Sequence, residues 1–290
     1  MPISSQPAVT HQTNKAAPVA PVSHTAPKAP AAPHAHDEHH AAASESACEG
    51  FGPQAPRDID HKEGLNKRIF STTPSYKEMN LCNIHFHNNA EHKAKAFSIY
   101  AGAGGGHGAH GGKGGGYQCN ISKSLTPAEL MPTQTEICKG IKPGDTIEVH
   151  WVHSSCAVKP GKGLGSCSSK SCLNPDLRVE TQVFTVVNDP TATNFNDLTY
   201  QGNKVNGLYQ AKSLPTNTGE PVVFTGSTTG PKYTEHTCSP MQVTWSVHPT
   251  CDKVDINSLG KWCKGNVFEE DHAHGVRKLV TNPELLSEIK

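Results

Sequence analysis

The sequence predicts a mainly β fold: a single domain built on one large, mostly antiparallel, twisted β-sheet, with few short helices and with loops held by disulfides. Short runs rich in Val, Thr and aromatic residues recur between clusters of Gly, Pro, Asn and Asp, which is the pattern of strands joined by turns. Ten cysteines lie at irregular spacings from Cys48 onward, as in the disulfide frameworks of proteins from oxidising compartments. Histidines also alternate with other residues in two of the predicted strands.

The size and charge of the chain narrow the class of protein. It has 290 residues with 26 basic and 26 acidic side chains, so its formal net charge is zero. A nucleic-acid-binding surface would need an excess of basic residues, so we expect no nucleic-acid partner. No run of about 18 apolar residues exists, so we expect no transmembrane segment. The sequence does not set the oligomeric state and leaves a dimer open.

The composition divides the chain into two parts. Residues 1–47 are rich in Ala, Pro, Ser and His, so we expect a disordered tail, either a flexible linker or a segment that captures metal. Residues 48–290 are expected to form one folded domain. The cysteines indicate the periplasm or secretion. Because the first residues lack the apolar stretch of a signal peptide, either a leader has been removed or this compartment prediction is wrong.

The segment before the first histidine-bearing strand contains several apolar residues. The candidate core positions among them are Phe51, Ile59, Leu65, Ile69 and Phe70. A helical pattern is visible only near residues 62–69 and residues 283–289. The rest of the domain is therefore expected to consist of strands and loops.

Two stretches have the composition of loops. Residues 101–116 are rich in glycine and contain His107 and His110, so we expect an exposed insertion, with an accessory metal or lid role as the alternative. Residues 159–170 are rich in Gly, Lys and Ser and lie among cysteines, so we expect a loop pinned by disulfides.

Five segments have the alternation or the β-branched content of strands, namely residues 83–87, 148–153, 181–187, 221–224 and 241–247. Successive side chains of a strand point to opposite faces, so His85 and His87 project to the same side. By the same rule Glu148 and His150 share a face, and His153 lies on the other. If these two strands pair, three imidazoles meet.

Three neutral imidazoles with one open position are a common arrangement for catalytic zinc, which lowers the pKa of its bound water to about 7. A ligating imidazole usually donates its second N–H to a carboxylate, and Glu148 lies on the right face for this role. The sequence thus points to one zinc ion per chain, held by His85, His87 and a third imidazole from residues 148–153. Cobalt or cadmium would suit the same three imidazoles.

The spacing of these residues resembles a known family. The pattern His-x-His-x-x-x-Glu-His at residues 85–92, followed by Glu-x-His-x-x-His at residues 148–153, resembles the zinc strands of the alpha-class carbonic anhydrases. The compact spacing and the many cysteines are more similar to the delta class and its bacterial relatives. Residues 224–231 and 243–245 are similar to the Thr-Thr loop and the Val-Thr-Trp strand of the alpha-class pocket.

The resemblance implies a role for each matching residue, and the three zinc ligands would be His85, His87 and His150. Thr228 would accept a hydrogen bond from zinc-bound hydroxide and donate its own proton to Glu91, which makes these two the catalytic residues. Because Gly230 replaces the first proline of the alpha-class loop, the choice between Thr228 and Thr229 stays open. The residues that would surround the ligands are Glu148, His92 and His153. The residues that would line the carbon dioxide pocket are Val152, Trp245 and Thr229.

The activity that the resemblance implies is that of a carbon–oxygen lyase, the reversible hydration of carbon dioxide to bicarbonate and a proton. One alternative is a copper/zinc superoxide-dismutase-like enzyme, which also uses His-x-His and a glycine-rich loop but needs an aspartate that residues 101–116 lack. A second alternative is a non-catalytic periplasmic zinc-binding protein. The metal content of the protein would distinguish the three. The anhydrase needs one tightly bound zinc ion, the dismutase needs copper plus zinc, and the zinc-binding protein takes several zinc ions weakly.

Overall fold

The computed structural model describes most of the chain after the tail. The described residues are 48, 52–104, 115–134, 137–228, 235–236, 239 and 241–290. The predicted tail and the histidines of the glycine-rich loop, His107 and His110, lie outside the described residues, as do Phe51 and Thr229. Among the described helices, none combines the length and the apolar character that a membrane span requires.

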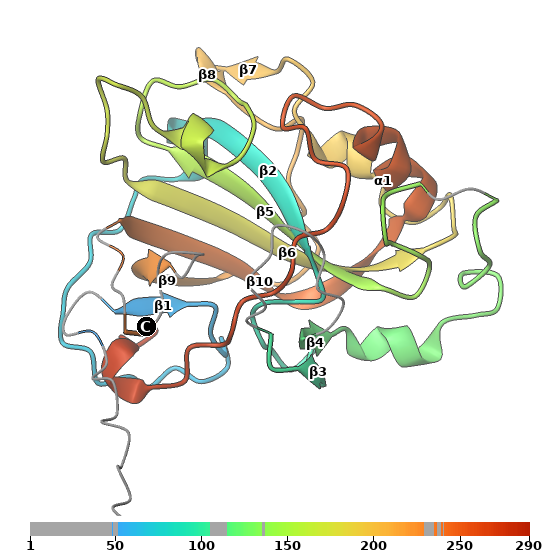
Figure 1. Cartoon of the computed structure of the whole chain (residues 1–290), viewed down its shortest axis with the longest axis horizontal. Coiled ribbons are helices and arrows are strands. Elements are labelled where there is room, and N and C mark those ends of the chain that lie inside the picture. The colour runs from blue at the N-terminus through green and yellow to red at the C-terminus, as the bar shows by residue number, and fades with distance from the viewer. Residues whose placement is uncertain are drawn as a thin grey trace, which may run out of the picture. The chain divides into compact units, whose positions relative to one another are not determined.

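One curled six-stranded sheet organises the described residues (Figure 1), in the order β1-β9-β10-β6-β5-β2. Its strands are β1 (Pro53–Ala55), β2 (Asn80–Asn88), β5 (Thr146–Ser154), β6 (Leu177–Val187), β9 (Val222–Thr228) and β10 (Gln242–Asp255). Three neighbouring pairs are antiparallel, β2 with β5, β5 with β6 and β9 with β10. The pairs β6 with β10 and β1 with β9 are parallel. The predicted mostly antiparallel sheet is confirmed, and each predicted strand segment overlaps one of its strands to within one residue.

Smaller elements connect these strands. Two separate two-stranded sheets are formed by β3 (Ile99–Gly102) with β4 (Gly116–Gln118), and by β7 (Lys204–Val205) with β8 (Leu208–Tyr209). The 3₁₀ helices are η1 (Tyr76–Glu78), η2 (Asn120–Ser124), η3 (Leu164–Cys167), η4 (Phe195–Leu198) and η5 (Pro283–Leu285). Between β7 and β8, Asn206 and Gly207 have φ angles of 51° and 82°. Positive φ at both central residues is what a tight two-residue hairpin turn requires.

The described chain has one α-helix, α1 (Ile256–Cys263), which begins directly after β10. The carboxylate of Asp255 accepts hydrogen bonds from two backbone N–H groups of the first turn, and so satisfies donors that lack a partner within the helix. Ile256, Leu259 and Trp262 are buried on one face. This helix was not predicted from the sequence.

The helix predicted for residues 62–69 is wrong. This segment runs without regular structure beside the end of the chain. The backbone N–H of Leu65 donates to the carbonyl of Pro283 at 2.7 Å, and that of Ile289 donates to the carbonyl of Lys62 at 2.8 Å. Backbone groups paired across the chain in this way cannot also pair within a helix. In the second predicted helical segment, only the short η5 forms.

The hydrophobic core lies on both faces of the sheet. The alternation of β5 divides its residues, because Val152 belongs to one buried cluster and Trp151 to the other. Two of the candidate core residues, Ile59 and Phe70, are buried. Leu65 and Ile69 are 67% and 93% exposed, so their assignment to the core is wrong. Their segment lies at the surface because it pairs with the chain end through its backbone.

The predicted disulfide framework is confirmed. The disulfides between described residues are Cys82–Cys167, Cys119–Cys251, Cys138–Cys263 and Cys156–Cys172. Cys48 is also disulfide-bonded, and no described cysteine is free. The first and last of the four bridges hold the loop of residues 159–170, as expected. Such bridges stabilise a fold mainly by restricting the unfolded chain.

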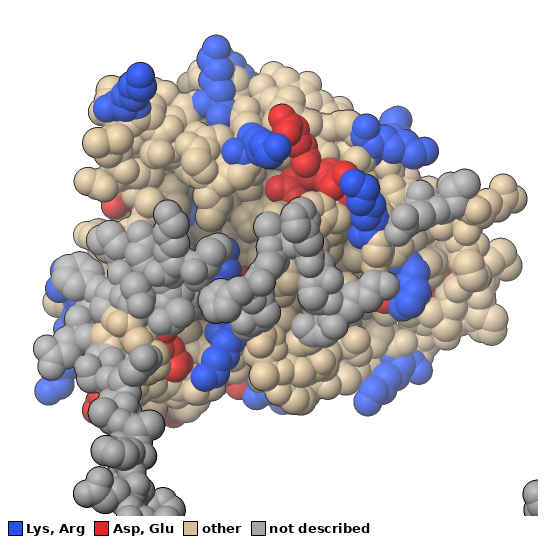
Figure 2. Space-filling view, in the orientation of Figure 1, with Lys and Arg blue, Asp and Glu red and all other residues tan. Residues whose placement is uncertain are grey.

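The segment after α1 returns along the outer strand of the sheet. The backbone N–H of His274 donates to the carbonyl of Phe86 at 2.8 Å, and that of Asn88 donates to the carbonyl of His274 at 2.9 Å. The same segment carries acidic residues, of which Glu269 pairs with Lys162 at 2.6 Å. On the face shown in Figure 2, one group of acidic side chains is bordered by basic ones, and other acidic side chains are scattered.

Candidate metal centre

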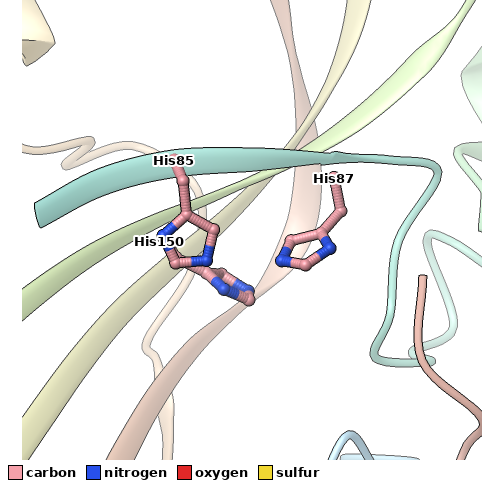
Figure 3. A group of neighbouring side chains, drawn as sticks. All are labelled: His85, His87 and His150. Atoms are coloured by element: carbon pink, nitrogen blue, oxygen red, sulfur yellow. The ribbon is translucent and has the colours of Figure 1, made fainter. Parts of the chain in front are cut away.

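β2 and β5 bring the three predicted histidines together. The antiparallel register places His85 opposite His150, and His87 projects from the same face of β2. The ring centroids are 4.9 to 5.2 Å apart. One nitrogen of each ring lies within 4.8 Å of the other two. Figure 3 shows the rings of His85 and His87 on the same side of β2, with that of His150 beside them.

The two histidines of β2 each have one ring nitrogen committed to an oxygen acceptor. Nδ1 of His85 lies 2.7 Å from Oδ1 of Asn83, and Nδ1 of His87 lies 3.1 Å from the carbonyl oxygen of Gly275. Because both oxygens can only accept, Nδ1 carries the proton and donates in each ring. Nε2 therefore keeps its lone pair. Nε2 of His87 is buried without a hydrogen-bond partner in the described chain, which fits a metal ligand.

Glu148 fixes the opposite tautomer in His150. Its Oε1 atom lies 2.6 Å from Nε2 of His150 and 2.7 Å from Nδ1 of His92, and its Oε2 atom accepts the backbone N–H of His92. Burial acts to raise the pKa of Glu148, but the charge of His92 and the hydrogen bonds from both imidazoles hold that pKa well below its usual value. The anionic carboxylate accepts a hydrogen bond from Nε2–H of His150. The lone pair of this ring is therefore on Nδ1.

The electrostatics of the cluster keep two of the rings neutral. Burial, reinforced by His150 and His87, lowers the pKa of His85 well below its ordinary value of 6.5. Burial also lowers the pKa of His87 to about 4, although Glu91 opposes the shift. Both rings are therefore neutral near pH 7, which is the form that binds a metal.

Glu91 is buried beside His87. Its Oε1 atom accepts the backbone N–H of Arg277 at 3.0 Å and lies 3.2 Å from Nδ1 of His87. Burial acts to raise the pKa of Glu91, but His87 and Arg277 lower it below its usual value. Thr228 is the last residue of β9, and its side chain lies outside the described part of the structure. The pair of Glu91 with Thr228 thus stays a prediction.

An apolar wall stands beside the imidazoles. The ring of Trp245 lies 5.4 Å from that of His150 and 5.0 Å from that of His92. It stacks on Phe224 with an interplanar angle of 13°. Val152 is buried in the same cluster of the core as Trp245. Two of the three residues predicted to line the substrate pocket, Val152 and Trp245, therefore lie in the same apolar cluster, and their role toward substrate remains a prediction.

His153 lies elsewhere. Its side chain projects from the face of β5 opposite to that of His150, Nδ1 donates to the carbonyl of Trp151 at 3.1 Å, and the ring packs against Tyr76 at 5.5 Å. It has no ring contact with the three clustered histidines in the described structure. This placement corrects the prediction that His153 lies next to the metal ligands.

The structure adds residues that the sequence reasoning missed. Asn83 lies two positions before His85 on the same face of β2, so the strand alternation alone would have found it. Gly275 comes from a segment without periodicity, about 190 residues further along the chain, and only the fold brings it to the site. His274, next to it, places its ring 5.6 Å from that of His85 and bonds Glu270 through Nε2 at 2.8 Å.

A comparison with protein families agrees with this geometry. The family model described as Delta carbonic anhydrase matches residues 76–258, which is more than half of the chain. The matched region includes all three clustered histidines and Glu148. No curated protein and no solved structure matches the chain. The match to the family nevertheless spans every strand of the six-stranded sheet except β1. The chain belongs to the delta carbonic anhydrase family.

Proposed function

We propose that this protein is a zinc-dependent carbonic anhydrase, which converts carbon dioxide and water reversibly to bicarbonate and a proton. The observation that supports this most is that one ring nitrogen each of His85, His87 and His150 lies within 4.8 Å of the other two, while Nδ1 of His85, Nδ1 of His87 and Nε2 of His150 each meet an oxygen acceptor. Zn²⁺, when bound there, lowers the pKa of water to about 7 and so supplies hydroxide at neutral pH.

The residues that hydrogen-bond the three imidazoles hold each ring in one tautomer and orientation. Asn83 and Gly275 hold the rings of β2 through Nδ1, so Nε2 faces the cluster. Glu148 holds His150 through Nε2. Residues of this kind fix the tautomer and the orientation of metal-binding histidines, and their loss typically weakens metal binding 10- to 100-fold.

Glu91 and Thr228 would orient the nucleophile. In this proposal the Thr228 hydroxyl donates its proton to the buried Glu91 carboxylate, so the Thr228 oxygen can only accept a hydrogen bond from hydroxide. That arrangement aims a lone pair of the nucleophile at the carbon atom of carbon dioxide. Trp245 and Val152 would keep water away from the approaching substrate, because both present apolar surface beside His150. Bicarbonate would leave in exchange for water.

The decisive experiment measures metal content and carbon dioxide hydration on the same samples. We expect one zinc ion per chain and hydration activity in the unmodified protein, and loss of both in His150→Ala. The matched control is His61→Ala, because the His61 side chain is 57% exposed and, among the described residues, forms an ion pair only with Glu63. One zinc ion per chain with normal turnover in His150→Ala would show that the site lies elsewhere.

The same measurement separates the two alternatives. Copper together with zinc would indicate a dismutase-like enzyme, and several weakly held zinc ions would indicate a zinc-binding protein without catalysis. A second group of residues that can hold a metal, His92 with Glu148 and His150, shares His150 with the first group. Its members already bond one another, so we do not assign it a second ion.

We also propose that the protein works in the periplasm or is secreted. The support is the disulfide framework, since bridges of this kind persist in oxidising compartments and are rare in the cytosol. Fractionation of cells that make the natural protein tests the proposal, and recovery in the cytosolic fraction would contradict it.

A further inference from the structure

Two histidines outside the candidate metal centre lead from it toward the surface. The ring of His274 lies 5.6 Å from that of His85 and 5.8 Å from that of His87. The ring of His272 lies in turn 5.5 Å from that of His274. Two imidazoles that bind one tetrahedral zinc ion have ring centroids about 5 Å apart, since each Zn–N bond is about 2 Å long. Each step of this series is therefore close to the separation that a shared ion requires.

These two histidines are much more accessible than the cluster that they approach. The side chains of His274 and His272 are 35% and 28% exposed. Those of His87 and His150 are each only 3% exposed. An ion in solution can therefore reach His272 and His274 directly, and His274 contacts the buried cluster.

Each of the two histidines has a carboxylate partner, as metal-binding histidines usually do. Nε2 of His274 lies 2.8 Å from Oε2 of Glu270, and Nδ1 of His272 lies 2.6 Å from Oδ1 of Asp271. In a neutral ring the nitrogen that faces the carboxylate carries the proton, and the other nitrogen carries the lone pair. Glu270 and Asp271 thus prepare these rings for a metal as Glu148 prepares that of its partner.

The charge of this segment favours a cation. Three acidic residues, Glu269, Glu270 and Asp271, follow one another directly before His272. Ion pairs with Lys162 and Lys139 balance the charges of Glu269 and Asp271, which leaves one negative charge among these five side chains. A negative charge beside the two imidazoles raises the rate at which a divalent cation meets them, and salt weakens this effect.

His272 and His274 do not form a tight site of their own. Neither group of three ligands that could hold a metal in the described chain includes either residue. Two imidazoles without a third protein ligand hold zinc weakly, so they also release it readily. A weak site in contact with a tight one is suited to transfer of the ion.

We propose that His272 and His274 form a transient zinc-binding site, which takes up the ion at the surface and passes it to the three clustered histidines. The inference rests on the proposed function, because it requires that the cluster holds zinc. It concerns the loading of the metal and not the reaction of carbon dioxide. Residues on the path of an ion lower the barriers to entry and to exit equally. They therefore change both rates and leave the equilibrium affinity unchanged.

Stopped-flow mixing of the metal-free, full-length protein with Co²⁺ tests the transfer. Tetrahedral Co²⁺ absorbs visible light, so the absorbance reports its arrival at the cluster, and displacement by a chelator gives the dissociation rate. In the double variant His272→Asn with His274→Asn, both rates should fall about tenfold, the lower end of the range for guided encounter. The affinity for Co²⁺ should stay the same. Asparagine keeps an N–H donor for each carboxylate.

The matched control is His61→Asn. His61 is exposed and pairs with a carboxylate, that of Glu63 at 3.0 Å, but in the described structure it has no ring contact with the clustered histidines. Its uptake and release rates should equal those of the unmodified protein. The single variant His272→Asn keeps the test decisive if the double variant fails to fold. It should lower both rates by a smaller factor.

Three results would overturn the transfer and leave the proposed function intact. The first is unchanged rates in the double variant and in His272→Asn. The second is a weaker affinity with faster dissociation, because the two histidines would then hold the bound metal in place. The third is an equal fall of the rates in His61→Asn, which would show a general effect of exposed histidines. Failure of the unmodified protein to bind Co²⁺ tightly would contradict the proposed function and the transfer together.

Discussion

The Oε1 atom of Glu148 lies 2.6 Å from Nε2 of His150 and so fixes Nε2 as the protonated nitrogen of that ring. The same carboxylate accepts two further hydrogen bonds, both from His92. Glu148 is fully buried, so no solvent competes for these bonds. A carboxylate that accepts three donors at once is hard to replace by any other side chain.

Glu148→Gln should therefore weaken zinc binding about 10- to 100-fold, the usual range for loss of a partner of a metal-binding histidine. The amide has one acceptor oxygen, and its NH₂ group would face N–H donors of His92 or His150. Competition with a chromogenic chelator measures the affinity. Glu63→Gln is the control, because the Glu63 side chain is 85% exposed. Unchanged zinc affinity in Glu148→Gln would refute the role of this carboxylate.

The predicted pair of Thr228 and Glu91 is tested by three single variants and one double variant. Thr228→Ala should keep zinc and lower the hydration rate by about 10², the scale for loss of one positioned polar group. Glu91→Gln should behave alike, and the double variant should be little worse because the two residues act as a unit. Thr229→Ala should cost much less. Full activity of Thr228→Ala would show that the pair has no role in the mechanism. Loss of zinc from Thr228→Ala would show that the loop has a structural role.

Acid should destabilise the fold through His153. Its pKa is lowered from 6.5 to about 3 by burial, so between these values the unfolded chain binds a proton that the folded chain does not. The free energy of unfolding should therefore rise with pH across this window, by up to about 1.4 kcal/mol per pH unit from this residue. Urea unfolding at a series of pH values measures the slope.

The control for this pH dependence is His153→Asn, in which the slope should fall by the contribution of one proton. Above about pH 6.5 the two proteins should have slopes that differ little, because His153 is then neutral in both states. An identical slope below pH 6 in the two proteins would show that His153 does not titrate as its burial implies.

The disulfides should differ in their contributions to stability. The chain-entropy argument gives about 3 kcal/mol for a loop near 15 residues and nearly 5 kcal/mol for one of about 100 residues. Cys156 and Cys172 are 16 residues apart, and Cys119 and Cys251 are 132 apart. Replacing both cysteines of a pair by Ser should thus cost more stability for Cys119–Cys251 than for Cys156–Cys172, as measured by denaturant unfolding.

Thiol titration of the unreduced, denatured protein should find almost no free thiol, and eight or more thiols would contradict the framework.

Deletion of residues 1–45 tests the predicted tail. Turnover and thermal stability should stay nearly unchanged, because this segment has almost no apolar side chain to pack. The full-length protein, purified in parallel, is the reference. A large loss of either property in the shortened protein would show that the segment takes part in the folded structure.

The strand alternation made the centre of the site predictable. A period of two put His85 and His87 on one face of β2, and Glu148 with His150 on one face of β5. The register of these strands then places His85 opposite His150 and His87 opposite Glu148. The chemistry of three imidazoles with a nearby carboxylate then pointed to a metal. The local pattern was sufficient because all four residues lie on two paired strands.

Residues outside regular strands could not be predicted in this way. Gly275 and Arg277 reach the site on a segment whose path is set by backbone pairing with β2, and no pattern in their own sequence signals it. The segment of residues 62–69 showed a helical pattern, but its backbone pairs with the end of the chain instead. Gly64 reflects this contact, since a Cβ atom there would lie 1.9 Å from the carbonyl oxygen of Leu286.

β2 is the last strand of the sheet order, and its outer side is bonded by the chain around His274. An uncovered outer strand offers free N–H and C=O groups to strands of other molecules, which is a route to aggregation. The residues that hold His87 in place thus also shield the sheet from its neighbours. Proteolytic loss of the chain after α1 would remove the contact that holds His87 and would also uncover the edge of β2. The protein with the disturbed histidine cluster would then also be the form that self-associates.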